Sequence, residues 1–288
     1  MDWIPYPVKE QICITEFFSM FKLDYDKTYI FSGETHNFWE CVYVISGSIC
    51  VSAGERVYNM SAGEIIFHKP YELHKFYTKG EKTARLFIFS YSAEGELCDY
   101  FCDKVFYLSE NQQRILINLI DYMNTQIYKW GINTENAREN MYLIPFEQIP
   151  SYSQTVTTQI YSLLFSLFNS SEAMPVLTSH DSVIFGEAVN YMNNRIYENP
   201  SVAEISKHVC ISQASLKRIF KKYSGLGTHK YFLKLKLKLA AELLENGASV
   251  TGTAEKLGFS SQGYFTKTFL REMGILPSSL CKKRQGAP

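Results

Sequence analysis

Residues 201–225 read SVAEISKHVCISQASLKRIFKKYSG, a stretch that predicts a short helix, a tight turn and a longer second helix. Ser201 and Glu204 have the spacing of a capping box, in which each side chain accepts a hydrogen bond from the other residue's backbone N–H at a helix start. Ser212 can cap the second helix, and Gly225 can end it because glycine tolerates the left-handed conformation common there. The stretch therefore predicts a helix-turn-helix unit.

A second unit with the same order of elements follows it. Residues 251–257 and 261–273 predict a short and a longer helix around a turn at Gly258, about 50 residues after the first turn. Residues 228–245 predict one long helix between the units, with an apolar stripe on its buried side. That stripe consists of Phe232, Leu235, Leu239 and Leu243. We therefore predict an all-α domain of two helix-turn-helix units bridged by a long helix.

Charge divides the chain at the start of this domain. Residues 181–288 contain 16 Lys and Arg against 8 Asp and Glu, whereas residues 1–180 contain 13 Lys and Arg against 21 Asp and Glu. A basic half suits contact with DNA phosphates, and two such units can place two helices in successive major grooves about 34 Å apart. The alternative from the residues alone is a helical bundle that never contacts DNA.

Residues 181–286 resemble the DNA-binding domain of the AraC/XylS family of bacterial regulators. The first unit has the family's order of apolar helix, Ser cap, Leu, Arg and Phe, and the segment YFLKLKLKLAAELL resembles its linker helix. The second unit, AEKLGFSSQGYFTKTFLREMGILPSSL, carries the family's Ala, Leu-Gly-Phe, Tyr-Phe, Phe, Gly and Pro. The resemblance implies a sequence-specific transcriptional regulator whose partners are double-stranded promoter or operator DNA and RNA polymerase.

Helical spacing separates core residues from exposed ones in the first recognition helix. The core set is Leu216, Ile219 and Phe220. The exposed candidates for DNA contact are Gln213, Ala214, Lys217, Arg218, Lys221 and Lys222. Arg218 can bind guanine O6 and N7 in a bidentate way, whereas Lys221 and Lys222 suit phosphates better. For each lysine, a solvated charge or a phosphate contact is an alternative to base reading.

In the second recognition helix, the resemblance assigns the DNA-facing positions to Gln262, Gly263, Thr266 and Lys267. The predicted core residues are Phe265, Thr268 and Phe269. Lys267 stands where the family commonly has Arg, which weakens bidentate reading of a base. Gly252 replaces an acidic residue usual in the preceding helix and costs about 1 kcal/mol relative to Ala. We therefore expect the first unit to supply most of the specificity and the second mainly backbone affinity.

The N-terminal half has a different pattern. From about residue 12 to residue 91, short runs rich in Val, Ile, Tyr and Phe alternate with glycines, as in an antiparallel barrel or sandwich. Apolar stripes at helical spacing follow at about 112–124 and 155–168. The segment 171–180, with Pro175, is the predicted linker. The chain is thus expected to be α+β, with a sensing and dimerisation domain at 1–170 and a DNA-binding domain at 181–288.

Two segments of this half resemble the strand-turn motifs of the cupin barrel, as it occurs in sensory domains of AraC-type regulators. They are ECVYVISG at residues 40–47 and GEIIFHKPYELH at residues 63–74. The resemblance covers roughly residues 20–92. It implies a cupin-like antiparallel β-barrel that binds a small-molecule effector and a dimer formed through one of the two following helices.

Four polar residues relate to the metal site of metal-binding cupins, which use two histidines and a glutamate on the first motif and a histidine on the second. His36, Glu40 and His74 match three of those positions, and Glu34 stands where the other histidine would be. Strand alternation lets Glu34, His36, Phe38 and Glu40 share one face. Such a set could hold a divalent transition metal, or hydrogen-bond an organic effector or each other. The resemblance favours an organic effector, so no metal or cofactor is predicted.

Aromatic residues nearby can wall the pocket or belong to the core. The two assigned to the ligand are Trp39 and Tyr43.

Together these features predict a cytoplasmic, homodimeric regulator that is not an enzyme, responds to a small molecule such as a sugar or a related metabolite, and activates transcription. Two alternatives remain open: a metal-dependent cupin enzyme with an accessory DNA-binding tail, and a regulator without a ligand. The first eleven residues, MDWIPYPVKEQ, are not expected to act as a secretory signal because they lack an apolar segment. The apolar stretch at 160–168 is too short to cross a bilayer, so no membrane partner is expected.

Overall fold

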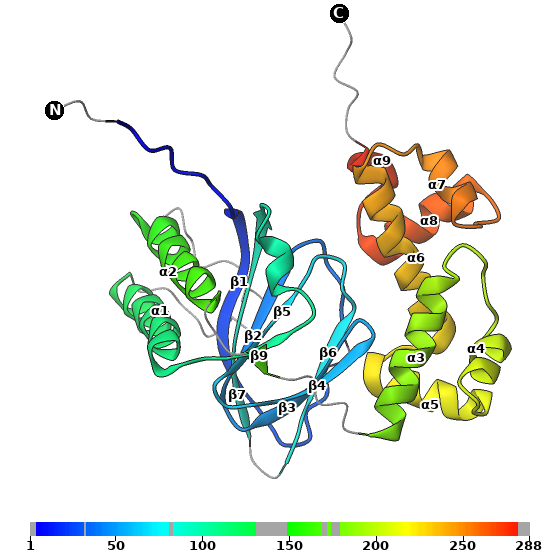
Figure 1. Ribbon diagram of the computed structural model, residues 1–288, viewed down its shortest axis with the longest axis horizontal. Helices are drawn as coiled ribbons and strands as arrows, with labels where there is room; N and C mark the ends of the chain where they lie inside the picture. The colour runs from blue at the N-terminus through cyan, green and yellow to red at the C-terminus, as the bar shows by residue number, and fades with distance from the viewer. Residues whose placement is uncertain are drawn as a thin grey trace, which may run out of the picture.

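The protein consists of a β-barrel that carries two helices on one side and an all-helical domain on the other (Figure 1). The structure, a computed structural model, describes residues 4–31, 33–80, 83–130, 149–168, 172–173 and 179–281. Among these residues, no helix combines the length and the hydrophobicity that crossing a membrane requires. The α+β architecture expected from the sequence is confirmed.

Two antiparallel sheets form the barrel. The larger sheet contains, in spatial order, β1 (Cys13–Tyr25), β7 (Ala84–Glu94), β2 (Trp39–Ser46), β5 (Glu64–His68), β8 (Val105–Tyr107) and β9 (Glu172–Ala173). The smaller sheet contains β4 (Arg56–Ser61), β3 (Ser48–Ala53) and β6 (His74–Thr78). Apolar residues of both sheets share one core cluster, so the inner faces of the two sheets pack against each other.

Strand alternation gives β2 two different faces. Val42 and Val44 point into the space between the sheets, whereas Cys41 and Tyr43 point outward into a second core that is covered by helices. The covering helices are α1 (Glu110–Lys129) and α2 (Tyr152–Leu167), and a short 3-10 helix, η1 (Cys98–Phe101), precedes them. Both helices lie where the apolar stripes predicted them.

The C-terminal domain contains the two predicted helix-turn-helix units. Its helices are α3 (His180–Asn194), α4 (Val202–His208), α5 (Gln213–Ser224), α6 (Thr228–Glu245), α7 (Val250–Lys256), α8 (Gln262–Met273) and α9 (Pro277–Leu280). Within the predicted linker at 171–180, residues 172–173 pair with β8 as strand β9, and Ser179 caps α3. The remainder of that linker, residues 171 and 174–178, lies outside the described residues.

The bridging helix α6 belongs to two cores in turn. Its first half buries Tyr231 and Phe232 in the core of the first unit, and its second half buries Leu237 and Leu244 in the core of the second. The predicted stripe agrees at Phe232 but shifts beyond it, because Leu235, Leu239 and Leu243 are only partly buried. A helix held between two units buries different faces along its length, which a single stripe does not describe.

Candidate functional site

A cavity of about 530 Å³ lies in the barrel, and β1, β2, β6, β7 and the loop before β2 contribute its walls. Phe18 stacks on Phe38 with ring centroids 4.0 Å apart, and Phe76 lines the same space. The polar part of the lining includes Glu34, His36, Glu40 and Ser90. Apolar walls with a few convergent polar groups are typical of sites for small molecules.

The loop that carries Glu34 is fixed to β6 through its backbone. The Glu34 N–H donates to the carbonyl of His74 at 3.0 Å, and the His74 N–H donates to the carbonyl of Glu34 at 3.1 Å. Gly33 has φ +91°, and a Cβ there would lie 3.1 Å from the carbonyl oxygens of both His74 and Ser224. Glycine fits this position because it has no Cβ and tolerates positive φ. The loop therefore passes between β6 and the end of α5.

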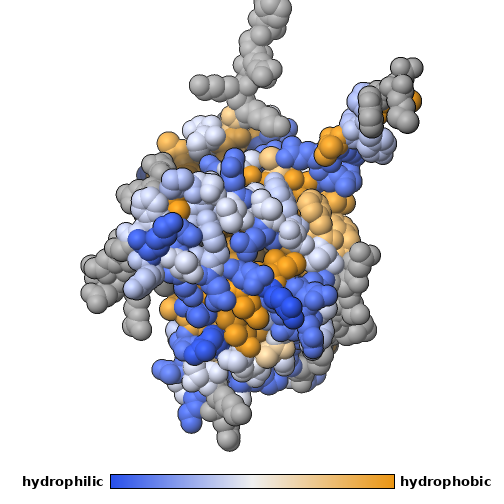
Figure 2. Space-filling view, turned by 90° about the vertical axis from the view of Figure 1, so that its left-hand side faces the viewer, coloured by the Kyte–Doolittle hydropathy of each residue, from blue (hydrophilic) through white to orange (hydrophobic). Residues whose placement is uncertain are grey.

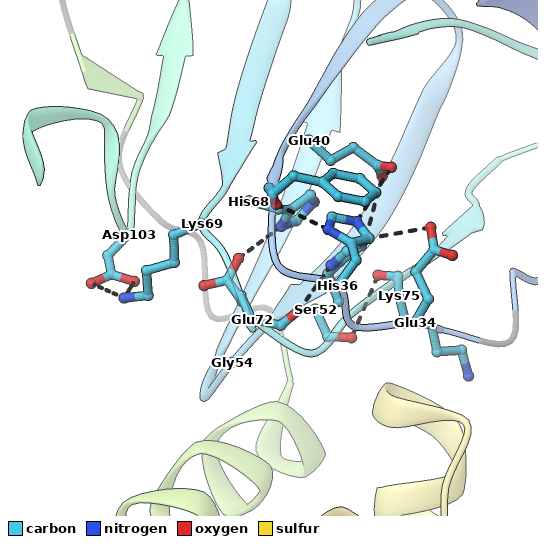
Figure 3. A network of polar contacts seen from close by, with 12 residues as sticks. Glu34, His36, Glu40, Ser52, Gly54, His68, Lys69, Glu72, Lys75 and Asp103 are labelled. Atoms are coloured by element: carbon cyan, nitrogen blue, oxygen red, sulfur yellow. Dashed lines mark hydrogen bonds and ion pairs between the residues drawn. The ribbon is translucent and has the colours of Figure 1, made fainter. Parts of the chain in front are cut away.

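The three polar residues predicted to share one face, Glu34, His36 and Glu40, lie close together (Figure 3), and His74 joins them. Nε2 of His36 lies 3.7 Å from one carboxylate oxygen of Glu40, and Nε2 of His74 lies 3.3 Å from the other. A carboxylate oxygen of Glu34 approaches Nε2 of His74 to 3.8 Å. We call these residues, Glu34, His36, Glu40 and His74, the barrel cluster.

Opposite charges shift the pKa values within this cluster. Burial raises the pKa of Glu40, but close contact with the ring nitrogens of His36 and His74 and their positive charge outweigh burial and hold that pKa well below its usual range. Burial lowers the pKa of His74, but Glu34 and Glu40 outweigh it and raise that pKa to about 10. Where no other cation occupies the cluster, Glu40 therefore pairs as a carboxylate with an imidazolium at His74.

A second buried pair, which the sequence analysis missed, supports His74 from behind. The His68 ring stacks on that of His74 with centroids 4.2 Å apart, and its Nδ1 lies 2.8 Å from a carboxylate oxygen of Glu72. Burial and the neighbouring His74 lower the pKa of His68. Strand alternation could have predicted that His68 points into the barrel, since it lies two residues after the inward-facing Ile66.

Trp39 and Tyr43, which we expected to contact the ligand, do not line the cavity. They alternate with Glu40 along β2 and therefore point to the opposite face, where both pack in the core beneath α1 and α2. The Tyr43 hydroxyl donates to Gln113 of α1 at 3.4 Å. These two assignments are corrected from ligand contacts to core residues.

The recognition helices α5 and α8 begin in the same way. The Ser212 hydroxyl accepts from the Ser215 N–H, and the Ser261 hydroxyl accepts from the Tyr264 N–H, both at 3.1 Å. The predicted core residues are buried: Leu216, Ile219, Phe220, Phe265, Thr268 and Phe269. The exposed residues are Gln213, Ala214, Lys217, Arg218, Lys221, Lys222, Gln262, Gly263 and Lys267, and Thr266 is half-buried. Their contact with DNA stays a prediction.

Arg218 has a partner within its own domain. Its guanidinium donates two hydrogen bonds to the carboxylate of Asp181, at 3.1 and 3.3 Å, and Nζ of Lys222 lies 3.4 Å from the same carboxylate. Hydrogen bonding from Arg218 lowers the pKa of Asp181. Asp181 lies in the first turn of α3, far from Arg218 in sequence, so helical spacing gave no sign of this contact.

The barrel holds the C-terminal end of α5. Nζ of Lys75 donates to the carbonyls of Lys221 and Lys222 at 3.1 and 2.6 Å, and the Ser52 hydroxyl donates to the carbonyl of Tyr223. A cation at this end of a helix opposes the negative pole of the helix dipole. Lys75 follows His74 in β6, so one residue belongs to the barrel cluster and the next contacts α5.

Comparisons with known proteins match both halves of the chain. Residues 22–129 match the model of an AraC-like ligand binding domain, and residues 205–283 match that of a helix-turn-helix domain. The chain is 23% identical over 257 residues to the uncharacterized HTH-type transcriptional regulator YidL of Escherichia coli, covering 88% of this chain and 78% of that protein.

Two further similarities concern one domain and the whole chain, respectively. The HTH-type transcriptional regulator ArgR of Pseudomonas aeruginosa is 33% identical over 101 residues, which cover 35% of this chain and 31% of that protein. Among solved structures, a crystal structure of ToxT from Vibrio cholerae is 14% identical with a TM-score of 0.37, covering 94% of this chain and 97% of that chain.

Proposed function

We propose, given that the chain belongs to the AraC family of transcriptional regulators, that a ligand in the barrel cavity controls how α5 contacts DNA. The observation that carries this proposal is the adjacency of His74 and Lys75 in β6. His74 belongs to the barrel cluster, whereas Lys75 binds the last carbonyls of α5. A ligand that binds the barrel more tightly in one arrangement of β6 thereby favours one arrangement of α5.

For DNA contact, we assign different tasks to the two recognition helices. Arg218 is the base-reading candidate of α5, because its guanidinium matches guanine in a bidentate way. Lys217, Lys221 and Lys222 add contacts to bases or phosphates, and Lys267 of α8 adds mainly a phosphate contact. The pairing of Arg218 with Asp181 must open for base contact, so DNA competes with an internal carboxylate.

The ligand proposed for the cavity is a small organic molecule, such as a sugar or a related metabolite. The aromatic walls suit its apolar face, and the carboxylates of Glu34 and Glu40 can accept hydrogen bonds from hydroxyl or amine groups.

The outer side of α1 and α2 is the surface proposed for a homodimer. Figure 2 shows hydrophobic residues among hydrophilic ones on the side of the molecule that carries these helices. Exposed large apolar residues of this region are Ile117, Tyr128, Trp130 and Phe165. Two copies joined here would present four helix-turn-helix units to paired promoter sites, where we expect the protein to activate RNA polymerase in the cytoplasm.

Genome-wide footprinting tests the proposed function. The purified full chain is bound to fragmented genomic DNA at near-physiological salt, alongside Arg218→Ala and Lys267→Ala. We expect discrete sites with two motifs about one helical turn apart, weakened mainly by Arg218→Ala. Diffuse binding with a steep salt dependence and no discrete sites would contradict the proposal.

A further inference from the structure

The barrel cluster brings four potential ligand atoms close together. One oxygen or nitrogen from each of Glu34, His36, Glu40 and His74 lies within 4.8 Å of the others. The closest measured approaches are 3.3, 3.7 and 3.8 Å, between histidine Nε2 atoms and carboxylate oxygens. Atoms bound to one zinc-type ion at about 2.0–2.2 Å lie roughly 3 to 4 Å from one another. A small inward movement would therefore complete a coordination shell.

Both histidines are oriented by backbone carbonyls. Nδ1 of His36 lies 2.9 Å from the carbonyl of Phe38, and Nδ1 of His74 lies 3.0 Å from the carbonyl of Glu72. A carbonyl only accepts, so each Nδ1 carries a proton and each Nε2 faces the cluster, where a metal ion can take the place of a proton on Nε2. Histidines that bind metal characteristically donate their other ring N–H to a carbonyl or carboxylate.

The Nε2 atoms are buried without a hydrogen-bond partner among the residues that the structure describes. The His74 side chain is 3% exposed, and the distance of 3.3 Å to Glu40 is an electrostatic contact without hydrogen-bond geometry. Buried polar atoms normally have a partner. Two such atoms aimed at two carboxylates form an arrangement that a bound metal ion would complete.

We propose that the barrel cluster binds one divalent transition metal ion, with His36, His74 and Glu40 as its protein ligands and Glu34 as a fourth. Two imidazole nitrogens with carboxylate oxygens suit Mn²⁺, Fe²⁺, Co²⁺, Ni²⁺ or Zn²⁺, whereas Ca²⁺ and Mg²⁺ prefer oxygen alone. Because the same residues line the cavity, the proposal deepens the proposed function: the ion adds a coordination position to which an oxygen donor of the effector binds.

The same geometry connects the ion to the rest of the molecule. Glu34 and His74 come from segments joined by two backbone hydrogen bonds, and Gly33 lies against the end of α5. An ion shared by Glu34 and His74 therefore holds the loop before β2 against β6, next to α5. Removal of the ion is expected to loosen this loop rather than to unfold the helices around the DNA-binding cores.

Metal titration tests the proposal on the full chain, purified without a metal-affinity tag and stripped with EDTA. Calorimetry with ZnSO4 is expected to show one site per chain, and Co²⁺ absorption is expected to lack the intense near-ultraviolet band of thiolate ligands, which excludes the cysteines as the source. His36→Gln and Glu34→Gln should each weaken binding about 10-fold to 100-fold. The exposed His229, replaced by Gln, is the control and should leave binding unchanged.

Glu34→Gln keeps the test decisive if His36→Gln fails to fold. The Glu34 side chain is 46% exposed, so its replacement should disturb the fold little. No saturable site, thiolate-type Co²⁺ spectra, or equal binding by wild type and the Glu34 and His36 variants would overturn the metal site. Footprinting of the stripped protein separates this failure from failure of the proposed function. Discrete DNA sites without metal binding would support the proposed regulatory function and overturn the metal site. Metal binding without discrete DNA sites would support the metal site and overturn the proposed function.

Discussion

The two helix-turn-helix units share one architecture but differ in what restrains their recognition helices. The barrel binds the last carbonyls of α5 through Lys75 and Ser52, and Asp181 holds Arg218. Among the described residues, α8 has no hydrogen bond to the barrel, and its Lys267 is exposed without an ion pair. The barrel therefore contacts the first recognition helix directly, whereas it reaches the second unit through Tyr71, which lies in that unit's core and donates to Glu245 of α6.

The largest expected effect concerns the cores of the two units. Phe220 and Phe269 are both fully buried, but their cores differ in what the barrel contributes. Cys50, Val57 and Leu73 belong to the core around Phe220, whereas among the buried residues that the structure describes Tyr71 alone of the barrel belongs to the core around Phe269. Phe220→Ala should lower the free energy of unfolding by roughly 3–5 kcal/mol and affect the barrel as well. Phe269→Ala should lower the free energy of unfolding by a similar amount but affect the barrel less, because only Tyr71 of the described barrel residues is buried in that core.

Tryptophan fluorescence distinguishes the two outcomes, because all three tryptophans lie in the N-terminal half and Trp39 is buried in the barrel core. In urea, the fluorescence transition should move to lower concentration in Phe220→Ala and move clearly less in Phe269→Ala. Equal shifts in both variants would mean that the second unit is coupled to the barrel as strongly as the first.

The next effect tests the restraint on α5 itself. Lys75→Met keeps much of the buried apolar stem but removes the donor to two helix carbonyls, which should cost about 1–3 kcal/mol locally. Hydrogen exchange at the C-terminal turn of α5 should become roughly 5-fold to 100-fold faster, with no change in α8. Lys79→Met, an exposed lysine close by in sequence, is the control. Unchanged exchange in α5 would remove the proposed route from the barrel to DNA.

A smaller effect is expected from the carboxylate that holds Arg218. Asp181→Asn should raise affinity for a footprinted site about 2-fold to 5-fold, because Arg218 and Lys222 no longer pair and a charge that repels phosphate is gone. Fluorescence anisotropy with a labelled duplex measures this. Glu198→Gln, which removes an exposed ion pair with Arg195, controls for net charge, and an equal gain there would show that charge alone is responsible.

The sign of the pH dependence follows from the direction of the shift at Asp181. Because pairing with Arg218 lowers its pKa, the pair contributes stability above the ordinary pKa of Asp and loses it as pH falls through the lowered value. Between about pH 6 and pH 8 the carboxylate stays charged. Any change of DNA affinity in that range therefore has another source. The ratio of the DNA affinities of Asp181→Asn and wild type should stay constant from about pH 6 to pH 8.

The sequence predicted what depends on local spacing. Helix caps such as Ser212 and Ser261, the buried face around Phe220, and the convergence of Glu34, His36 and Glu40 all follow from neighbours in the chain. Contacts between distant elements did not follow from such patterns. Nothing in the residue pattern of β6 indicates that Lys75 binds α5. The pattern of β6 is that of an ordinary strand and the pattern of α5 is that of an ordinary helix, and neither depends on the other element.

The wrong assignment of Trp39 and Tyr43 and the incomplete description of α6 have the same origin. Trp39 and Tyr43 were assigned to the ligand by residue type, although alternation with Glu40 places them on the opposite face of β2. The predicted residues of α6 beyond Phe232 do pack against the two cores but are only partly buried, whereas Leu237, which was not predicted, is fully buried. In both cases the periodicity of the strand or helix was assigned correctly. The sequence did not show which part of the molecule packs against each face of β2 and of α6.

The smallest expected effect completes the comparison of the two units. Lys267→Ala should weaken binding only a few-fold, by the same factor on specific and non-specific DNA, because an exposed lysine acts mainly on phosphates. The slope of log affinity against log salt should become shallower by about 1. Arg218→Ala, in contrast, should lower affinity for the specific site about 10-fold to 100-fold and leave non-specific binding nearly unchanged. If Lys267→Ala also removed discrimination between the two DNAs, α8 would read bases, and the difference between the two units would lie only in their contact with the barrel.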